Sequence, residues 1–211
     1  MYLANLSWVV SWDTIQFSFM NKGRLEAFSD GVIAIIITIM VLSLEAPKGS
    51  NLNDLVPLIP KFVCYLLSFI FVGIYWNNHH HMMQMVKSVG GMSLWANLNL
   101  LFWLSLIPFA TDWMGENNFT TWPVVLYGVV LLMCAIAYSI LYTQLVKHPH
   151  GNPELQAAVG DGRKEKLSLV LYIVAIITAF MYTWISLGIF VFVAAIWFIP
   201  DTRIEKHMEK K

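Results

Sequence analysis

Residues 24–42 read RLEAFSDGVIAIIITIMVL, and this stretch decides what kind of fold the chain can adopt. It is long and apolar enough for a membrane-spanning helix, yet Arg24 and Asp30 lie near its start. A charge one or two turns inside a membrane helix is costly, so such a charge indicates a functional site. Beyond Asp30 the stretch contains one hydroxyl, Thr38, in a run rich in isoleucine. The pattern predicts a polar anchor at one end of this helix and a narrow apolar passage at the other.

The composition of the whole chain predicts an integral membrane protein. Of its 211 residues, 58% are hydrophobic and 12% are charged, and the mean hydropathy is +0.63. Soluble domains carry about 25% charged residues. The formal net charge is zero, which disfavours a nucleic-acid partner, because nucleic-acid binding relies on an excess of basic residues. Cys64 and Cys134 both lie in apolar segments, so we predict two buried thiols and no disulfide.

Six apolar blocks follow one another, each near the ~20 residues that a bilayer-spanning helix requires. Polar and turn-forming residues separate most of them, but the last connection, Trp184–Gly188, is so short that a tight antiparallel hairpin is expected. We therefore predict an all-α membrane protein with six transmembrane helices in one domain, residues 22–205, between a segment 1–21 and a basic tail 206–211. The predicted spans are roughly residues 25–46, 57–80, 92–113, 121–146, 166–184 and 187–201.

The basic residues predict how the helices are oriented. With six spans, both termini share one side of the membrane with the second and fourth loops. Eleven Lys and Arg residues fall on that side and only Lys48 and Lys61 fall on the other. Cytoplasmic loops carry the excess of Lys and Arg, so we predict a multi-pass cell-membrane protein with both termini in the cytoplasm. The eleven are Lys22, Arg24, Lys87, Lys147, Arg163, Lys164, Lys166, Arg203, Lys206, Lys210 and Lys211.

The first 19 residues do not fit this pattern. They are apolar and aromatic, but too short and poorly patterned for a span, and they lack the basic region of a signal peptide. Either they form an interfacial amphipathic segment, or translation begins at Met20. We favour the later start, which N-terminal mass spectrometry of the native protein would test.

Three polar clusters are predicted to meet at the cytoplasmic end of the helices. An aspartate as deep as Asp30 needs hydrogen-bond donors, and the candidates are His79, Asn78, Asn97 and the Trp76 indole. The cluster is either a buried tie that fixes helix packing or a proton-responsive gate, because histidine titrates near physiological pH. The three clusters are Arg24, Phe28, Ser29 and Asp30; Trp76–His81 with His79 and His80; and Asn97 and Asn99, early in the third span, which continues to Ser105–Thr111.

The consecutive histidines His79–His81 do not predict a metal site. Metal ligands on a helix favour i, i+3 or i+4 spacing, whereas three successive side chains point in three directions. No Glu or Cys stands close in the sequence to complete a ligand shell. The chain also lacks a Ser-His-Asp pattern and a Gly-rich phosphate loop, so we predict neither an enzyme nor a bound cofactor.

The isoleucines of the first span supply a second candidate feature. Ile35, Ile39 and Leu42 share one helical face through their i, i+4, i+7 spacing, and Thr38 lies beside that face. Such a stripe is also typical of an ordinary lipid-facing or packing surface. Periodicity alone does not decide between the two, because every nearby position is apolar; Thr38 and the polar anchor favour a passage.

Together these motifs resemble those of the transmembrane protein 175 family, the lysosomal potassium channels, and its prokaryotic relatives. The family signature R-x-x-x-F-S-D matches Arg24, Phe28, Ser29 and Asp30. The W-x-x-H-H ending of the second helix matches Trp76, His79 and His80, and a third helix that ends in S-L-I-P-F matches Asn97 through Phe109. The resemblance covers most of residues 22–200.

The resemblance implies a cation channel that has no T-V-G-Y-G filter of backbone carbonyls. In the family the first helix lines the pore, and an isoleucine after F-S-D, here Ile35, forms a hydrophobic constriction. Ile39 and Leu42 would continue the constriction, and the Thr38 hydroxyl would supply a modest preference for K+ over Na+. Animal members place a serine before the constriction isoleucine in at least one repeat, where this chain has Ala34, which implies weaker selectivity.

The single six-span unit also bears on assembly. The animal proteins of the family carry two such repeats and pair as dimers, so the resemblance implies a homotetramer in a prokaryotic plasma membrane. It leaves open whether Na+ and H+ pass along with K+.

Two other classes of function stay open on the residues alone. A proton-coupled transporter would use Asp30 and His79 as its relay, although transporters place their sites in broken helices between internal repeats, which the first span lacks. A structural membrane protein or enzyme subunit would pass no ions in proteoliposomes. Unitary currents would identify a channel.

Overall fold

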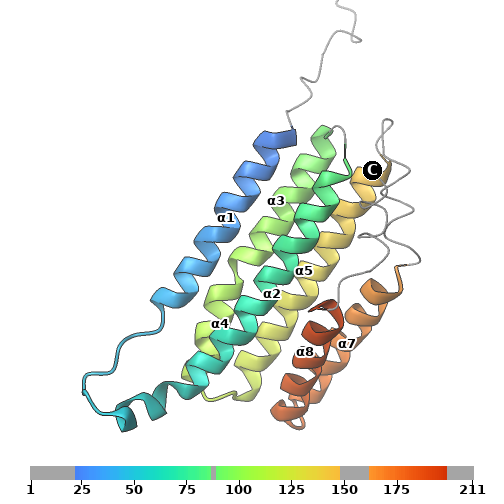
Figure 1. The fold of residues 1–211 in the computed structure, drawn as a ribbon. Helices are drawn as coiled ribbons and strands as arrows, with labels where there is room; N and C mark the ends of the chain where they lie inside the picture. The colour runs from blue at the N-terminus through green and yellow to red at the C-terminus, as the bar shows by residue number, and fades with distance from the viewer. Residues whose placement is uncertain (1–21, 87–88, 148–161, 199–211) are drawn as a thin grey trace, which may run out of the picture.

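The structure is a computed structural model, and it describes residues 22–86, 89–147 and 162–198. Within these ranges the chain is helical, with its long helices side by side (Figure 1). The predictions for the N-terminal segment and the basic tail lie outside the described residues. The helices are α1 (Lys22–Leu42), the short 3-10 helix η2 (Leu52–Leu58), α2 (Ile59–Gln84), α3 (Gly91–Ser105), α4 (Ile107–Glu116), α5 (Thr121–Lys147), α7 (Arg163–Ala179) and α8 (Thr183–Phe198).

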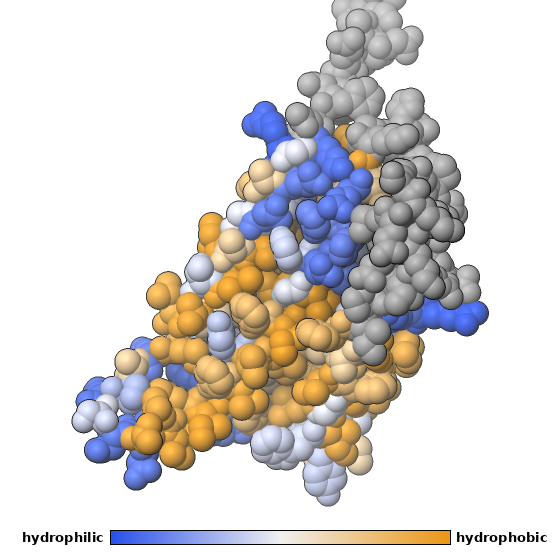
Figure 2. All heavy atoms as spheres, in the orientation of Figure 1, coloured by the Kyte–Doolittle hydropathy of each residue, from blue (hydrophilic) through white to orange (hydrophobic). Residues whose placement is uncertain are grey.

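The outer surface matches a membrane protein. On the face that Figure 2 shows, apolar residues cover the middle of the bundle and polar residues lie toward both ends. Among the described residues, four helical stretches are long and apolar enough to cross a membrane: Lys22–Leu42, Leu52–Gln84, Gly91–Glu116 and Thr121–Lys147. Helices α7 and α8 are shorter, at 17 and 16 residues. The count of six crossings therefore stays a prediction.

The third predicted span consists of two helices rather than one. α3 ends at Ser105 and α4 begins at Ile107. Pro108, in the first turn of α4, has no N–H, and its ring would clash with the carbonyl four residues earlier in a continuous helix. The chain turns at Leu106, whose N–H bonds to the carbonyl of Trp103, three residues back (3.2 Å). The proline thus sets a break in the middle of an otherwise apolar stretch.

The last hairpin was predicted with its turn in the wrong place. α7 and α8 do form a tight pair (Figure 1), but the turn comprises residues 180–182, and Trp184–Gly188 lies inside α8. Ser186, which suggested a turn, donates instead to the carbonyl of Ala175 in α7 (2.7 Å). A serine in this position joins two helices, because its hydroxyl satisfies a carbonyl across the interface.

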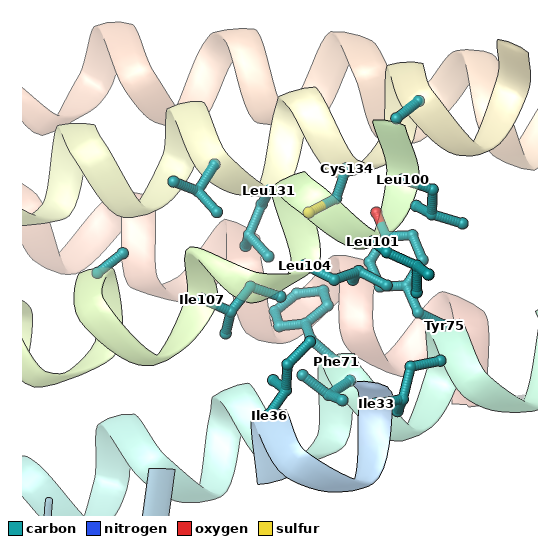
Figure 3. Close-up of a cluster of buried hydrophobic side chains, with 14 of the residues drawn as sticks. Ile33, Ile36, Phe71, Tyr75, Leu100, Leu101, Leu104, Ile107, Leu131 and Cys134 are labelled. Carbon is teal, nitrogen blue, oxygen red and sulfur yellow. The ribbon is translucent and has the colours of Figure 1, made fainter. Parts of the chain in front are cut away.

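One face of α1 completes the core of the bundle. Ile33 and Ile36 point toward Phe71 of α2 (Figure 3), and each is only 2% exposed. Behind Phe71, the core contains Leu104 of α3 and Leu131 of α5, both fully buried. The core thus packs against the inner side of α1, and the described residues do not cover Ile35, Ile39 and Leu42 on its other side.

Candidate functional site

The exposed side of α1 follows a regular repeat. Exposed residues recur at alternating steps of four and three positions, the 3.5-residue spacing that keeps one seam of a helix facing a neighbouring helix. Among them, Ile35 is 58% exposed, Ile39 48% and Leu42 78%. Residues 25, 29, 33, 36 and 40 form the buried side. We call the exposed set the α1 stripe: Arg24, Phe28, Gly31, Ile35, Thr38 and Leu42, with Ile39 beside it.

A buried hydrogen-bond chain holds the start of α1 to two neighbouring helices. The hydroxyl of Ser29 donates to the Leu25 carbonyl (2.9 Å) and accepts from the amide nitrogen of Asn97 in α3 (2.9 Å). The oxygen of Asn97 accepts from Nε2–H of His79 in α2 (2.8 Å). Ser29 and Asn97 are fully buried and His79 is nearly so. Because the Asn97 oxygen can only accept, Nε2 of His79 carries the hydrogen in this chain.

A second polar group lies on the accessible side of the same helix end. The indole N–H of Trp76 donates to a carboxylate oxygen of Asp30 (3.0 Å). His80 stacks on this indole, with ring centroids 5.7 Å apart and planes 16° apart. The amide of Gln84 donates to Nε2 of His80 (2.8 Å). The contact between Asp30 and Trp76 joins α1 to α2 beside the buried chain.

The structure separates residues that the sequence pattern grouped together. Of the four donors considered for Asp30, Trp76 takes that role. His79 donates to Asn97 and Asn97 donates to Ser29. Asn78 donates to the Ile74 carbonyl of its own helix (2.8 Å). Within the described ranges Asp30 forms no ion pair with Arg24. In the same part of the chain, no three His, Cys, Asp or Glu residues gather as a metal site would require.

Two polar groups escaped the sequence reasoning. The first is a hydroxyl cluster in the core, where Ser68 lies 2.7 Å from the Thr111 hydroxyl and 3.0 Å from that of Tyr127, joining α2, α4 and α5. The second is Lys61 of α2, which pairs with acidic residues of α4. The sequence signal that could have predicted both groups is a single polar residue within an apolar run, because a polar atom in the hydrocarbon region needs a hydrogen-bonding or charged partner.

A groove runs beside the α1 stripe. Ile35 and Ile39 lie on one wall, and the region around the break between α3 and α4 forms the other. The groove carries few polar groups, and Asp112 is the charged one among its lining residues. The groove is lined by Val32, Ile35, Ile36, Ile39, Ser43, Ser105, Pro108, Phe109 and Asp112.

Comparisons with known proteins agree on one family. The family described as endosomal/lysosomal potassium channel TMEM175 matches residues 24–108. A potassium channel of Chryseobacterium sp. (strain P1-3) is 53% identical over 191 residues, which cover 90% of this chain and 100% of that protein. The human endosomal/lysosomal proton channel TMEM175 is 31% identical over 81% of this chain, but the match spans only 38% of the human protein.

The fold has a counterpart among solved structures. A crystal structure of a lysosomal potassium-selective channel TMEM175 homologue from Chamaesiphon minutus superimposes with a TM-score of 0.75 at 27% sequence identity. The match covers 85% of this chain and 97% of that one. The similarity thus extends over nearly the whole of the solved chain rather than over a shared pair of helices.

Proposed function

The chain belongs to the TMEM175 family, and from this premise we propose that it is a potassium-permeable cation channel whose pore is lined by α1. The family consists of channels and not of enzymes. The observation that carries the proposal is the α1 stripe, because a helix with one buried and one exposed face suits a position at a symmetry axis. The same helix carries the signature residues Arg24, Phe28, Ser29 and Asp30.

The pore would narrow at Ile35. A ring of isoleucine side chains offers no oxygen to replace the hydration shell of an ion, so its tendency is to exclude water and block. Ile39 and Leu42 would extend this dry section by two turns, since both lie on the exposed side of the helix. Conduction then requires the ring to widen enough to admit water. The constriction replaces the carbonyl filter of ordinary potassium channels.

Thr38 would supply the modest preference for K+ over Na+. Its hydroxyl donates to the Ile35 carbonyl (2.8 Å), so its hydrogen is engaged while its oxygen lone pairs stay available to a cation. Ala34, also on the exposed side, adds no second oxygen. One oxygen ligand per helix near an apolar ring is expected to discriminate weakly.

The polar contacts at the start of α1 would set the width of the pore. The chain from Ser29 through Asn97 to His79 and the contact between Asp30 and Trp76 join α1 to α2 and α3. A small change in the tilt of α1 about this fixed end moves Ile35 toward or away from the axis. We include Arg24, Phe28 and His80 in this gating network because they lie at the same end of the helices.

Four copies of the chain would surround one axis. A single chain presents one α1 stripe, and a narrow ring needs several. We propose a homotetramer in a prokaryotic cell membrane, with six crossings per chain, both termini in the cytoplasm and the surrounding bilayer as the other partner. Membership of a channel family does not favour the alternative of a proton-coupled transporter with Asp30 and His79 as relay.

The decisive experiment places asparagine at the constriction. Ile35→Asn in purified protein reconstituted into liposomes should raise K+ flux and reduce the K+ over Na+ permeability ratio, because a polar ring keeps the neck wet. Ile177→Asn is the matched control, since Ile177 is 60% exposed but lies on α7. Unchanged currents and selectivity in Ile35→Asn would remove Ile35 from the constriction. Reversal potentials under K+, Na+ and pH gradients give the permeability of each ion.

A further inference from the structure

The end of the bundle opposite Asp30 holds a charged group that the constriction does not explain. We call it the distal end; it contains the end of α1 at Leu42, the start of α2 and the end of α4 at Glu116 (Figure 1). Asp112 of α4 lies at this end and lines the same groove as Ile35 and Ile39. Its side chain is 37% exposed. A carboxylate therefore shares a groove with the residues of the proposed pore.

The charge of Asp112 is only partly neutralised. Its cationic neighbour is Lys61 of α2, whose ammonium lies 3.8 Å from the Asp112 carboxylate. The same ammonium lies closer to Glu116, at 2.9 Å, where it donates a hydrogen bond. The single ammonium of Lys61 thus lies between two carboxylates and interacts mainly with that of Glu116. The three groups together carry one net negative charge, and Asp112 is the member that lines the groove.

The other charged residues described at the distal end do not cancel this excess. They are Glu45, Lys48 and Asp54 in the connection between α1 and α2, two acidic residues and one basic. The distal end therefore has four carboxylates and two ammonium groups per chain. In an assembly of several copies these charges would add at the mouth of the pore.

The constriction cannot by itself tell a cation from an anion. Ile35, Ile39 and Leu42 are uncharged, and a ring of them excludes hydrated ions of either sign alike. Carboxylates at the mouth of a narrow passage with low-dielectric walls concentrate cations and repel anions. Since the groove that contains Asp112 adjoins the constriction, this residue has the charge and the location to supply that discrimination.

We propose that Asp112 determines the preference of the channel for K+ over Cl− at the distal mouth, and that Lys61 limits the strength of this effect. The inference rests on the proposed function. It assigns a specificity-determining role to a residue outside the family signature and outside the α1 stripe. Lys61 acts as a positioning residue, because its ammonium divides its charge between Asp112 and Glu116.

Salt dependence separates this role from a structural one. The Debye length is about 30 Å at 0.01 M salt and about 3 Å at 1 M. A surface charge that supplies cations to the pore therefore acts at low salt and is screened at high salt. A variant that damages the fold instead lowers the conductance at every salt concentration.

The experiment measures unitary K+ conductance at 0.01 M and 1 M KCl, and the K+ to Cl− permeability ratio from a KCl gradient. Asp112→Asn should lower the conductance at 0.01 M by about twofold or more and reduce the permeability ratio, with little change at 1 M. Lys61→Gln should change both low-salt quantities in the opposite direction. Asp54→Asn is the control, because it removes the same charge at the same end without lining the groove.

Each outcome decides the inference. Opposite effects of Asp112→Asn and Lys61→Gln that disappear at 1 M KCl would support it. An Asp112→Asn conductance that equals wild type at low salt, falls equally at both salt concentrations, or falls no more than that of Asp54→Asn would overturn it. The proposed function is tested separately, because the Asp112, Lys61 and Asp54 variants all retain Ile35. If the wild-type protein conducts K+ and Ile35→Asn alters the flux, the proposed function stands even when the Asp112 variant shows no effect.

Discussion

At the scale of single residues, the placement of Ser29 shows how a small polar side chain can organise a membrane helix. Its hydroxyl satisfies a carbonyl of its own helix and at the same time accepts from Asn97. Interhelical hydrogen bonds in membranes average about 0.6 kcal/mol and reach about 1.7. The bond is thus moderate in strength, but it orients the Asn97 amide and through it the His79 ring.

Ser29→Ala should therefore destabilise the protein more than an equivalent change elsewhere. The substitution leaves the amide of Asn97 without its acceptor in a buried position, at a cost of about 1–3 kcal/mol. Ser139→Ala is the matched control, because the Ser139 hydroxyl also donates to the carbonyl four residues earlier (2.9 Å) and, in the described part of the chain, bonds to no other helix. Thermal unfolding in detergent measures both. Equal shifts of the unfolding midpoint would show that the bond between α1 and α3 contributes nothing to stability.

At the scale of elements, the close approach of α2 and α4 sets the geometry of the distal end. A Cβ atom on Gly115 would lie 2.8 Å from the Cα of Lys61, which is backbone and cannot rotate away. The glycine therefore lets the two helices meet where Lys61 reaches Asp112 and Glu116. The break at Leu106, which Pro108 sets, separates α4 from α3 before this contact. Together these two residues position the wall of the groove.

Gly115→Ala should force α2 and α4 apart. Overpacking of this kind typically costs about 1–3 kcal/mol, so the unfolding midpoint should fall. In contrast, a Cβ at Gly73 meets nothing within 4 Å, and Gly73→Ala should leave stability unchanged or raise it by about 1 kcal/mol through helix propensity. Thermal unfolding of the two variants side by side tests the contact. A Gly115→Ala protein as stable as Gly73→Ala would mean that the helices are not in close contact there.

At the scale of the whole molecule, the proposed assembly rests on the side of α1 that no other described helix covers. The inner side of the helix packs against the core, whereas Ile35 and Leu42 are 58% and 78% exposed. Exposed aliphatic residues also suit contact with lipid, so exposure does not by itself decide where the axis lies. The signature residues on the same helix favour the axis.

Cysteine cross-linking distinguishes these two positions. In a homotetramer with α1 at the axis, Ile35→Cys should form intermolecular disulfides on oxidation, because disulfides require Cα atoms about 4.4–6.8 Å apart. Ile36→Cys is the control, since Ile36 is 2% exposed and faces the core of its own chain. The native Cys64 and Cys134 are buried and should not contribute. Native mass spectrometry should give four times the 24.1 kDa of one chain.

A contrary result is equally clear. Cross-linking of Trp95→Cys on α3, a position that is 70% exposed, without cross-linking of Ile35→Cys would place another helix at the contact between copies. A mass equal to one chain under conditions that preserve ion flux would contradict the tetramer.

Much of the fold could be predicted from local sequence. Composition indicated a membrane protein, and apolar blocks located the long helices, because hydrophobicity and helix length are properties of neighbouring residues. The turn at residues 180–182 was misplaced because Ser186 and Gly188 resemble a turn locally while their helix is held by a contact with Ala175. The break at Leu106 was missed because Pro108 lies within an otherwise continuous apolar stretch.

The sequence by itself determined that this chain forms apolar helices, that the stretch from Arg24 to Leu42 carries the signature residues, and that this stretch has an isoleucine face. Only the tertiary structure decided that Ser29 pairs with Asn97, that Trp76 serves Asp30, and that Lys61 lies between Asp112 and Glu116. The physical reason is that helical periodicity is encoded within a few turns. Which polar groups meet depends instead on the rotation and axial offset of each helix, and those are set by packing across the whole bundle.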